Sequence, residues 1–396
     1  MFRALVIWVS AIALSLVAGI TAIGSVSKKK APQLAVMLQP VNGFALDTMS
    51  RVQLVNEIGK SNGKFPVSIS SQEQSLAQRA FKSEPFSISA IVALAVGAST
   101  ASNRDSLMTK ASVLTRRDSM LSAWMIADAA EKNDLAKLLK YYDVTMRTNG
   151  ASQSILLPEI AKLVANDRFI PPLATALERN PNWADAFWRT LVGTKSSLKN
   201  AVLLRRALTG PAATTARNSD VDLIAALVTN YHFDTAYQLY RQLNKDAKIG
   251  VDVFSSGSGG SGPYAPIDWQ LNSNGQYGAQ IVNGKLEISA TANSGGEFAK
   301  RLMEISPGRY DVVTGIENFN DQDALLNMHI SCAETKQNGA KEWKMKLGSG
   351  MNRQDFVAPA NLCTYYWVKL KGASGTTDLD AVINKIELVS ASSASN

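Results

Sequence analysis

The sequence contains two histidines and two cysteines, the residue types from which a catalytic nucleophile and base or a zinc site is most often built. His232 stands between two predicted helices and His329 lies among apolar residues of a predicted strand, and no nucleophile elbow accompanies either. A zinc site of His and Cys would need nearly all four side chains in one place. We therefore expect no enzyme, no metal site and no cofactor. A pair of carboxylates brought together in space for glycoside cleavage stays open.

Cys332 and Cys363 fall in two separate predicted strands of one domain, which favours a disulfide between them. The enclosed loop of about 30 residues would stabilise the domain by roughly 3–4 kcal/mol in the chain-entropy description. The alternative is a pair of buried free thiols in a cytoplasmic protein, which fits the apolar amino terminus less well. A disulfide in turn requires an oxidising compartment.

The strand that follows Cys363 has one apolar face, and its other face carries Tyr365, Trp367 and Lys369. If the apolar face is core, both aromatic rings point outward, where they can stack on the C–H surface of a sugar. Lys369 would then meet sugar hydroxyls beside them. These three residues are the candidate glycan-binding site, and the alternative is that Trp367 packs beneath a loop.

The amino terminus carries an apolar run without charge from Ala4 to Ile23, which is long enough to cross a bilayer as a helix. A cleaved secretory signal usually has a shorter apolar part and a small-residue cleavage site. Residues 17–19 form only a passable site of that kind. We expect residues 1–30 to be an uncleaved membrane anchor, with secretion after cleavage as the alternative.

Two features disagree on the orientation of this anchor. Lys28, Lys29 and Lys30 would hold the following chain in the cytoplasm by the positive-inside tendency, whereas the two cysteines require an oxidising compartment. Large domains translocate largely regardless of charge, so the cysteines decide. We expect a single-pass protein of the bacterial inner membrane with its bulk in the periplasm.

Beyond a connecting segment at 31–70, residues 71–250 have the spacing of short amphipathic helices. Turn signals recur there at intervals of 30 to 34 residues. They are Glu84, Asp118, Asn149, Asn180, Gly210 and Asn244. This interval matches a pair of antiparallel helices with two turns.

The stretch 174–183, with Asn180-Pro181 followed by Trp183, resembles the end of one tetratricopeptide repeat and the aromatic start of the next. Residues 80–86 have the same form. The resemblance implies a solenoid of stacked helices whose concave surface holds a protein partner. We expect the aromatic rings of this region to form the core between repeats.

The net charge of +8 is unevenly distributed along the chain. Basic residues exceed acidic ones by seven in residues 64–250, whereas acidic residues exceed basic ones by three in residues 251–396. Solvated helix faces explain the basic excess, and contact with acidic headgroups or an acidic glycan is the alternative. The sequence contains no basic-aromatic nucleic-acid motif, and we expect no nucleic-acid partner.

A Gly/Ser-rich linker at 251–263 precedes a change from helical to alternating periodicity. Trp343, Met345 and Leu347 alternate with Lys344 and Lys346, as in a strand with one buried face. Many short strands predict a β-sandwich at 264–390, in jelly-roll form, before a disordered tail at 391–396.

The layout of this domain resembles galactose-binding-like and carbohydrate-binding-module sandwiches of secreted bacterial proteins. The resemblance rests on residues 266–269, 302–310, 330–332 and 380–383. It implies glycan binding and, in some members, a structural calcium, for which Asp378 and Asp380 are candidates by position alone.

The sequence thus predicts a multidomain α plus β protein with a transmembrane helix, a helical solenoid and a β-sandwich. Its expected function is a membrane-anchored periplasmic adaptor that holds a protein partner and binds or senses polysaccharide. Helical-repeat proteins with such a sandwich are similar to accessory proteins of bacterial exopolysaccharide systems. The alternative is a structural subunit of a larger membrane complex without a glycan ligand.

Overall fold

A computed structural model describes residues 2–244, 254, 261–319, 323–334, 342–360 and 362–391. The chain forms two compact units, the first made of residues 1–156 and Pro181–Trp183, the second of residues 157–180 and 184–396. Each unit is considered by itself. The predicted linker at 251–263 and tail at 391–396 lie largely outside the described residues.

The amino-terminal helix α1 spans Phe2–Ser27. Its segment Ile7–Ser27 is long and apolar enough to cross a membrane, and only 6% of its most apolar window is buried within the protein. The expected apolar helix is therefore present and unpacked. A membrane anchor and a signal sequence both have these properties.

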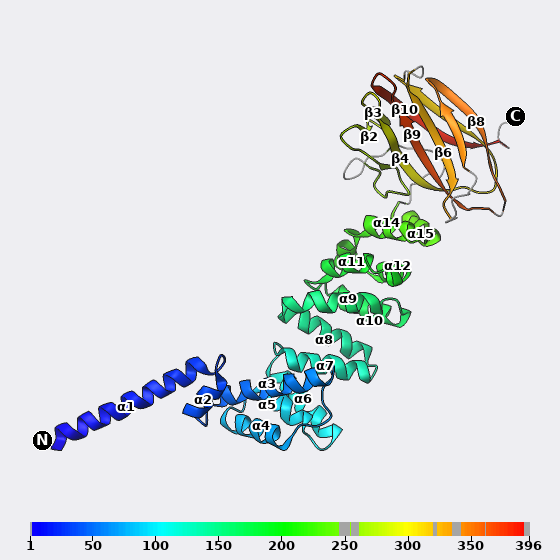
Figure 1. Cartoon of the computed structure of the whole chain (residues 1–396). Helices are drawn as coiled ribbons and strands as arrows, with labels where there is room; N and C mark the ends of the chain where they lie inside the picture. The colour runs from blue at the N-terminus through cyan, green and yellow to red at the C-terminus, as the bar shows by residue number, and fades with distance from the viewer. Residues whose placement is uncertain are drawn as a thin grey trace. The chain divides into compact units, whose positions relative to one another are not determined.

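Most of the chain up to residue 244 is helical (Figure 1). Three short 3₁₀ turns interrupt this series at Gly150–Ser152, Asp167–Phe169 and Lys195–Ser197. The α-helices after α1 are α2 Pro32–Leu38, α3 Gly43–Lys60, α4 Ser71–Ser83, α5 Ile88–Val96, α6 Ala101–Leu114, α7 Ser119–Glu131, α8 Leu135–Thr148, α9 Gln153–Leu163, α10 Ile170–Glu178, α11 Ala184–Val192, α12 Leu198–Ala207, α13 Gly210–Arg217, α14 Asp220–Thr229 and α15 Phe233–Leu243.

The turn signals read from the sequence lie at helix ends. Asp118 caps α7 by accepting a hydrogen bond from the backbone of Leu121, and Asn149 and Asn244 follow the last residues of α8 and α15. Asn180 and Gly210 have left-handed backbones, with φ of 44° and 53°. Asn180 lies just after the end of α10, whereas Gly210 is the first residue of α13. The predicted helices are confirmed, whereas the regular repeat of helix pairs and the tetratricopeptide resemblance stay predictions.

The segment 31–70 is not only a connection, because it forms α2 and α3. Leu46 and Leu54 of α3 are buried in the same core as residues of α4 to α7. The other buried positions of α3 are the small residues Gly43, Ala45 and Ser50, so its apolar stripe is weak in the sequence. This is why the helix was not predicted.

Aromatic side chains of the helical region pack between helices, as predicted. In the first unit Trp183 is 1% exposed, and its ring nitrogen donates a hydrogen bond of 2.8 Å to Asp143. In the second unit Phe187 and Trp188 of α11 are buried, with ring centroids 5.7 Å apart. These rings form core and are closed to a ligand.

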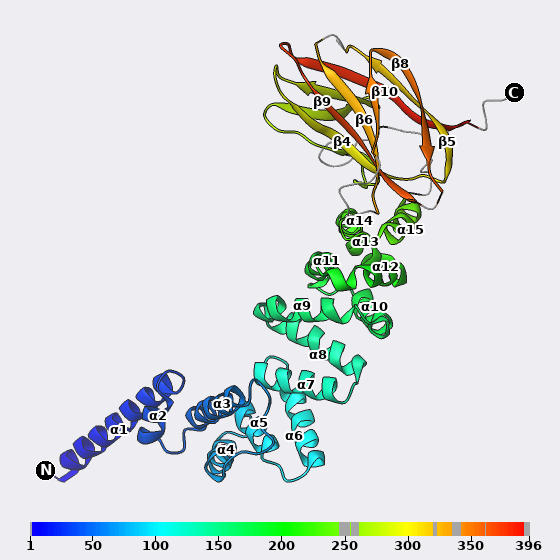
Figure 2. The ribbon, with the colours of Figure 1, turned by 45° about the vertical axis from the view of Figure 1, so that its right-hand side comes forward.

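Residues 270–390 form a sandwich of two antiparallel sheets, in the order β1-β4-β9-β6-β7 and β2-β3-β10-β5-β8 (Figures 1 and 2). The predicted β-sandwich is confirmed. The strands are β1 Gln270–Leu271, β2 Tyr277–Val282, β3 Lys285–Ala290, β4 Gly295–Glu304, β5 Gly308–Glu317, β6 Leu325–Cys332, β7 Trp343–Leu347, β8 Gly350–Ala358, β9 Tyr365–Ala373 and β10 Leu379–Ser390.

The core of the sandwich lies between the two sheets. Phe298, Leu326 and Ile383 are fully buried there, together with apolar residues from every long strand. Phe254, although it belongs to the predicted linker, is 3% exposed and packs near Trp269, with ring centroids 6.2 Å apart. At this residue the linker is part of the domain core.

Candidate functional site

The outward face of the β1-β4-β9-β6-β7 sheet carries the residues singled out from the sequence. Along β9, Tyr366, Val368 and Leu370 are buried in the core, so Trp367 and Lys369 take the opposite face. The predicted alternation of this strand is therefore correct. The outward residues of β9 differ in burial, since Tyr365 is buried whereas Trp367 and Lys369 are partly exposed.

Trp367 is half-buried in the middle of this face. In the sheet register it pairs with Leu302 of β4 and Ser331 of β6. The ammonium of Lys300 lies 5.6 Å from the centroid of its ring, at cation–π distance. The indole is thus held among β4, β9 and β6, with an ammonium group over its ring.

Lysines surround Trp367 on neighbouring strands. Lys300 of β4 lies opposite Lys369 of β9, and Lys369 is also opposite His329 of β6. His329 in turn is opposite Lys344 of β7. A second row lies two residues away on each of three strands. It is formed by Lys371, Asn327 and Lys346. We call this surface the lysine face, defined as Trp367 with Lys300, Lys344, Lys346, Lys369 and Lys371.

One carboxylate stands among these lysines. The two oxygens of Glu297 lie 3.9 Å from the ammonium groups of Lys300 and Lys369. These distances exceed hydrogen-bond length, so Glu297 screens the two lysines without binding either closely. At the strand end, Glu342 lies 3.0 Å from Nδ1 of His329. The face keeps a positive excess.

Tyr365 lies on the same face but is closed to solvent. It is 5% exposed, and its hydroxyl donates a hydrogen bond of 2.7 Å to Asp234 of α15. Its ring lies between those of Phe233 and Tyr237, with centroids 5.4 and 5.2 Å away. Tyr365 is a packing residue between helix and sheet, and we leave it out of the binding surface proposed below.

Helix α15 is bound to the sandwich by further polar contacts within the second unit. Tyr237 donates to the carbonyl of Leu302 at 2.7 Å and accepts from the backbone of Glu304 at 3.0 Å. Tyr240 donates to Asp268 at 2.7 Å. Burial raises the pKa values of the Tyr237 and Tyr240 phenols. The helix thus covers one end of the sheet and leaves the lysine face beside it.

Cys332 and Cys363 form a disulfide, as predicted. Cys332 is the last residue of β6 and is opposite Tyr366, whereas Cys363 lies two residues before β9 begins. The bridge therefore fixes the entry of β9, the strand that carries Trp367 and Lys369.

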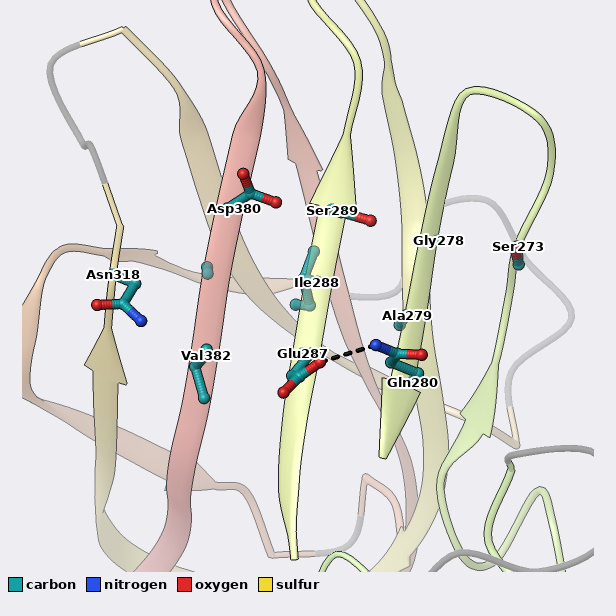
Figure 3. A pocket seen from close by; sticks show the side chains of 11 residues that line it. Ser273, Gly278, Ala279, Gln280, Glu287, Ile288, Ser289, Asn318, Asp380 and Val382 are labelled. Carbon is teal, nitrogen blue, oxygen red and sulfur yellow. Dashed lines mark hydrogen bonds between the residues drawn. The ribbon is translucent and has the colours of Figure 1, made fainter. Parts of the chain in front are cut away.

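A second candidate surface lies on the outward face of the other sheet. A shallow hollow of about 460 Å³ is lined by polar side chains of β2, β3 and β10 (Figure 3). Gln280 donates to Glu287 at 2.7 Å, and Ser289 and Asp380 stand further along the neighbouring strands. These groups can bind hydroxyls, but the lining contains no aromatic ring on which a sugar could stack.

The histidines and the carboxylates singled out from the sequence lie apart from the lysine face or between its lysines. No cluster of three or more His, Cys, Asp or Glu side chains suited to a metal ion occurs among the described residues. His232 directly precedes α15. Desolvation by partial burial lowers its pKa, and the positive charge of Lys199 lowers it further. Asp378 accepts a hydrogen bond from the backbone of Ala292, and Asp380 lines the hollow.

Sequence reasoning missed four members of the lysine face: Lys300, Lys344, Lys346 and Lys371. They come from three strands, and only the order β4-β9-β6-β7 brings them together. The available signal was that Lys344 and Lys346, like Lys369 and Lys371, sit two residues apart in strands with one apolar face.

No protein-family model matches the sequence, and no curated protein matches it. Solved structures similar to the sandwich include TmCBM61 in complex with β-1,4-galactotriose. The identity is 8%, the TM-score 0.24, and the match covers 34% of this chain and 97% of that one. The family 11 carbohydrate-binding module of the cellulase Lic26A-Cel5E of Clostridium thermocellum is 12% identical at a TM-score of 0.23, covering 37% and 97%.

A third similar structure is the glycosylation associate protein (Gap123) complex from Streptococcus agalactiae. Its identity is 11%, its TM-score 0.25, and the match covers 37% of this chain and 45% of that one. At these identities and scores the likeness is one of fold alone.

Proposed function

We propose that this chain is a membrane-anchored polysaccharide-binding protein whose sandwich holds the glycan on the lysine face. The observation that carries the proposal is Trp367, a half-buried indole held in a central strand and framed by Lys300 and Lys369. An aromatic ring beside hydrogen-bond donors is the combination that recognises a pyranose, since the ring stacks and the donors reach the hydroxyls.

The neighbours of Trp367 supply the polar part of such a site. Ser331 is directly opposite it on β6, and Asn327 lies four residues further along β6, between Lys371 and Lys346. A hydroxyl and an amide each donate and accept, which suits sugar hydroxyls. Because the strands fix the backbone at these positions, binding of a glycan has to order the side chains alone.

The remaining parts of the chain have roles that follow from this proposal. The apolar helix Ile7–Ser27 anchors the protein in the bacterial inner membrane, and the disulfide favours a periplasmic location for the bulk. The stacked helices hold a protein partner of an envelope or exopolysaccharide assembly system. The chain binds its glycan and carries out no chemistry on it.

The proposal is tested on the full chain in detergent, by affinity electrophoresis in gels containing a panel of bacterial polysaccharides. We expect retardation by at least one polysaccharide and a loss of affinity of about tenfold in Trp367→Ala, because the variant removes the aromatic surface on which the sugar would stack. The matched control is Phe86→Ala, which removes an exposed ring from the first unit and should leave retardation unchanged.

Circular dichroism distinguishes loss of binding from loss of fold in Trp367→Ala. Equal retardation of the wild type and a folded Trp367→Ala would remove this residue from the site. If the wild type binds none of the panel and co-purifies with a stable membrane complex, the chain is a structural subunit and the proposal is wrong.

A further inference from the structure

We infer that the polysaccharide held on the lysine face is anionic, with carboxylate or other acidic groups along its chain. This inference rests on the proposed function and specifies its ligand. It comes from the arrangement of the lysines and from a comparison of the two outward faces of the sandwich.

Two of these lysines stand directly opposite one another on neighbouring strands, and the others face each other across β6, with His329 or Asn327 between them. Lys300 and Lys369 are register partners, and Lys369 and Lys344 flank His329 in the same row. Paired strands are about 4.8 Å apart, so Lys300 and Lys369 leave the sheet at adjacent points. Like charges directly opposite in a sheet destabilise it, so the pairing of Lys300 with Lys369 works against the stability of the sheet.

The positive charge of the lysine face is poorly compensated. Of the five lysines, Lys300 and Lys369 share one carboxylate, that of Glu297, at 3.9 Å. Lys344 and Lys346 are exposed on β7, and the structure records no ion pair for either within the described residues. An acidic polymer lying across β4, β9, β6 and β7 would supply the missing counter-charges.

The opposite sheet has a different charge arrangement. On its outward face Lys285 pairs with Glu317 at 3.0 Å and Lys385 pairs with Glu387 at 2.8 Å. Glu287 and Asp380 add further negative charge around the hollow. In a domain where acidic residues outnumber basic ones, the lysine excess is therefore confined to one face.

The same surface fits a polysaccharide better than a lipid bilayer. A protein surface that inserts at a membrane presents several exposed apolar side chains together with its lysines. Among the described outward residues of this sheet, Leu325 at the start of β6 is the one large apolar side chain that is strongly exposed. Trp367 is half-buried and level with the sheet.

The test compares polygalacturonate with the same polymer after reduction of its carboxyl groups, using the full chain in detergent. We expect the acidic polymer to bind at least tenfold more tightly and its affinity to fall steeply between 50 and 300 mM salt. The double variant Lys344→Gln/Lys346→Gln should lose about tenfold in affinity for the acidic polymer only. The matched control Lys285→Gln/Lys385→Gln should bind as the wild type does.

The outcomes separate this inference from the proposed function. Equal binding of the acidic and reduced polymers, lost in Trp367→Ala, would overturn the anionic ligand and leave glycan binding in place. Binding of neither polymer nor of any polysaccharide in the panel would mean that the proposed function itself fails.

A lipid role is examined with the chain in nanodiscs. Binding of polygalacturonate should be equal in discs of neutral lipid and in discs containing phosphatidylglycerol. Loss of binding in the anionic discs alone would assign the lysine face to lipid headgroups and overturn the inference.

Discussion

The hydroxyl of Tyr365 donates a 2.7 Å hydrogen bond to Asp234, which joins the first residue of β9 to the first turn of α15. Two residues along the same strand, on the same face, Trp367 is half-buried and lies at cation–π distance from Lys300 of β4. The outward face of the sheet is thus divided between a packed end and an open part. Alternation along the strand alone could not separate the two.

Removal of the Tyr365 hydroxyl should weaken the packing of α15 on the sandwich. We expect Tyr365→Phe to lower the free energy of unfolding by about 1–3 kcal/mol, because the carboxylate of Asp234 loses a donor in a partly buried place. Denaturant unfolding followed by near-ultraviolet circular dichroism measures this. Tyr277→Phe, whose hydroxyl has no recorded hydrogen bond within the described residues, is the control, and equal losses in both variants would contradict the account.

Alkaline pH should destabilise this packing. Burial raises the pKa values of Tyr237, Tyr240 and Tyr365 above the ordinary phenol value of 10.0. Their stabilising contribution is therefore complete below pH 10 and is lost as the pH rises further, because the unfolded chain releases its phenol protons first. The free energy of unfolding, measured from pH 8 to 12, should decline with rising pH, and the decline should be smaller in Tyr237→Phe than in the wild type. An identical pH dependence in the two proteins would contradict a role of the Tyr237 phenol.

Loss of the disulfide should destabilise the sandwich. The cysteines are 31 residues apart, and the double variant Cys332→Ser/Cys363→Ser should be less stable by roughly 3–4 kcal/mol in the chain-entropy description. Reductant should lower the unfolding midpoint of the wild type and leave that of the variant unchanged. Two titratable thiols in protein purified without reductant would contradict the bridge.

Acid should destabilise the attachment of the loop between β9 and β10, which donates hydrogen bonds to Asp323. Hydrogen bonds from Thr377 and Thr376 hold the pKa of Asp323 below its ordinary value of 3.8. The unfolded chain therefore binds a proton at higher pH, and the contribution of Asp323 is complete above about pH 4 and is lost below it. Asp323→Asn should be less stable than the wild type at pH 6, and the difference should shrink at pH 3. If the difference in the free energy of unfolding between the wild type and Asp323→Asn were the same at pH 3 and pH 6, the hydrogen bonds to the Asp323 carboxylate would not contribute to stability.

Local patterns were sufficient to predict much of this fold. Asp118 and Gly210 mark helix ends through capping and a left-handed backbone, which are properties of single residues and their neighbours. Met345 and Leu347 show a buried strand face by simple alternation. The pairing of Cys332 with Cys363 followed because both were assigned to one domain.

The features that were missed depend on contacts between distant segments. Helix α3 buries mainly small residues, and its place in the core is set by the neighbouring helices. Tyr365 was assigned to the glycan site because nothing in the sequence of β9 indicates that Asp234, 131 residues earlier, lies against it. The lysine face likewise depends on the strand order, which alternation does not specify.

The central claim is that a polysaccharide contacts Trp367, and ¹⁹F NMR of the full chain labelled with 5-fluorotryptophan tests it most directly. The Trp367 signal is assigned by its loss in Trp367→Phe, and the buried Trp183 and Trp269 serve as internal references. Titration with a bound acidic polysaccharide should shift or broaden the Trp367 signal and leave the references unchanged. Binding that leaves the Trp367 signal unaltered would contradict the account.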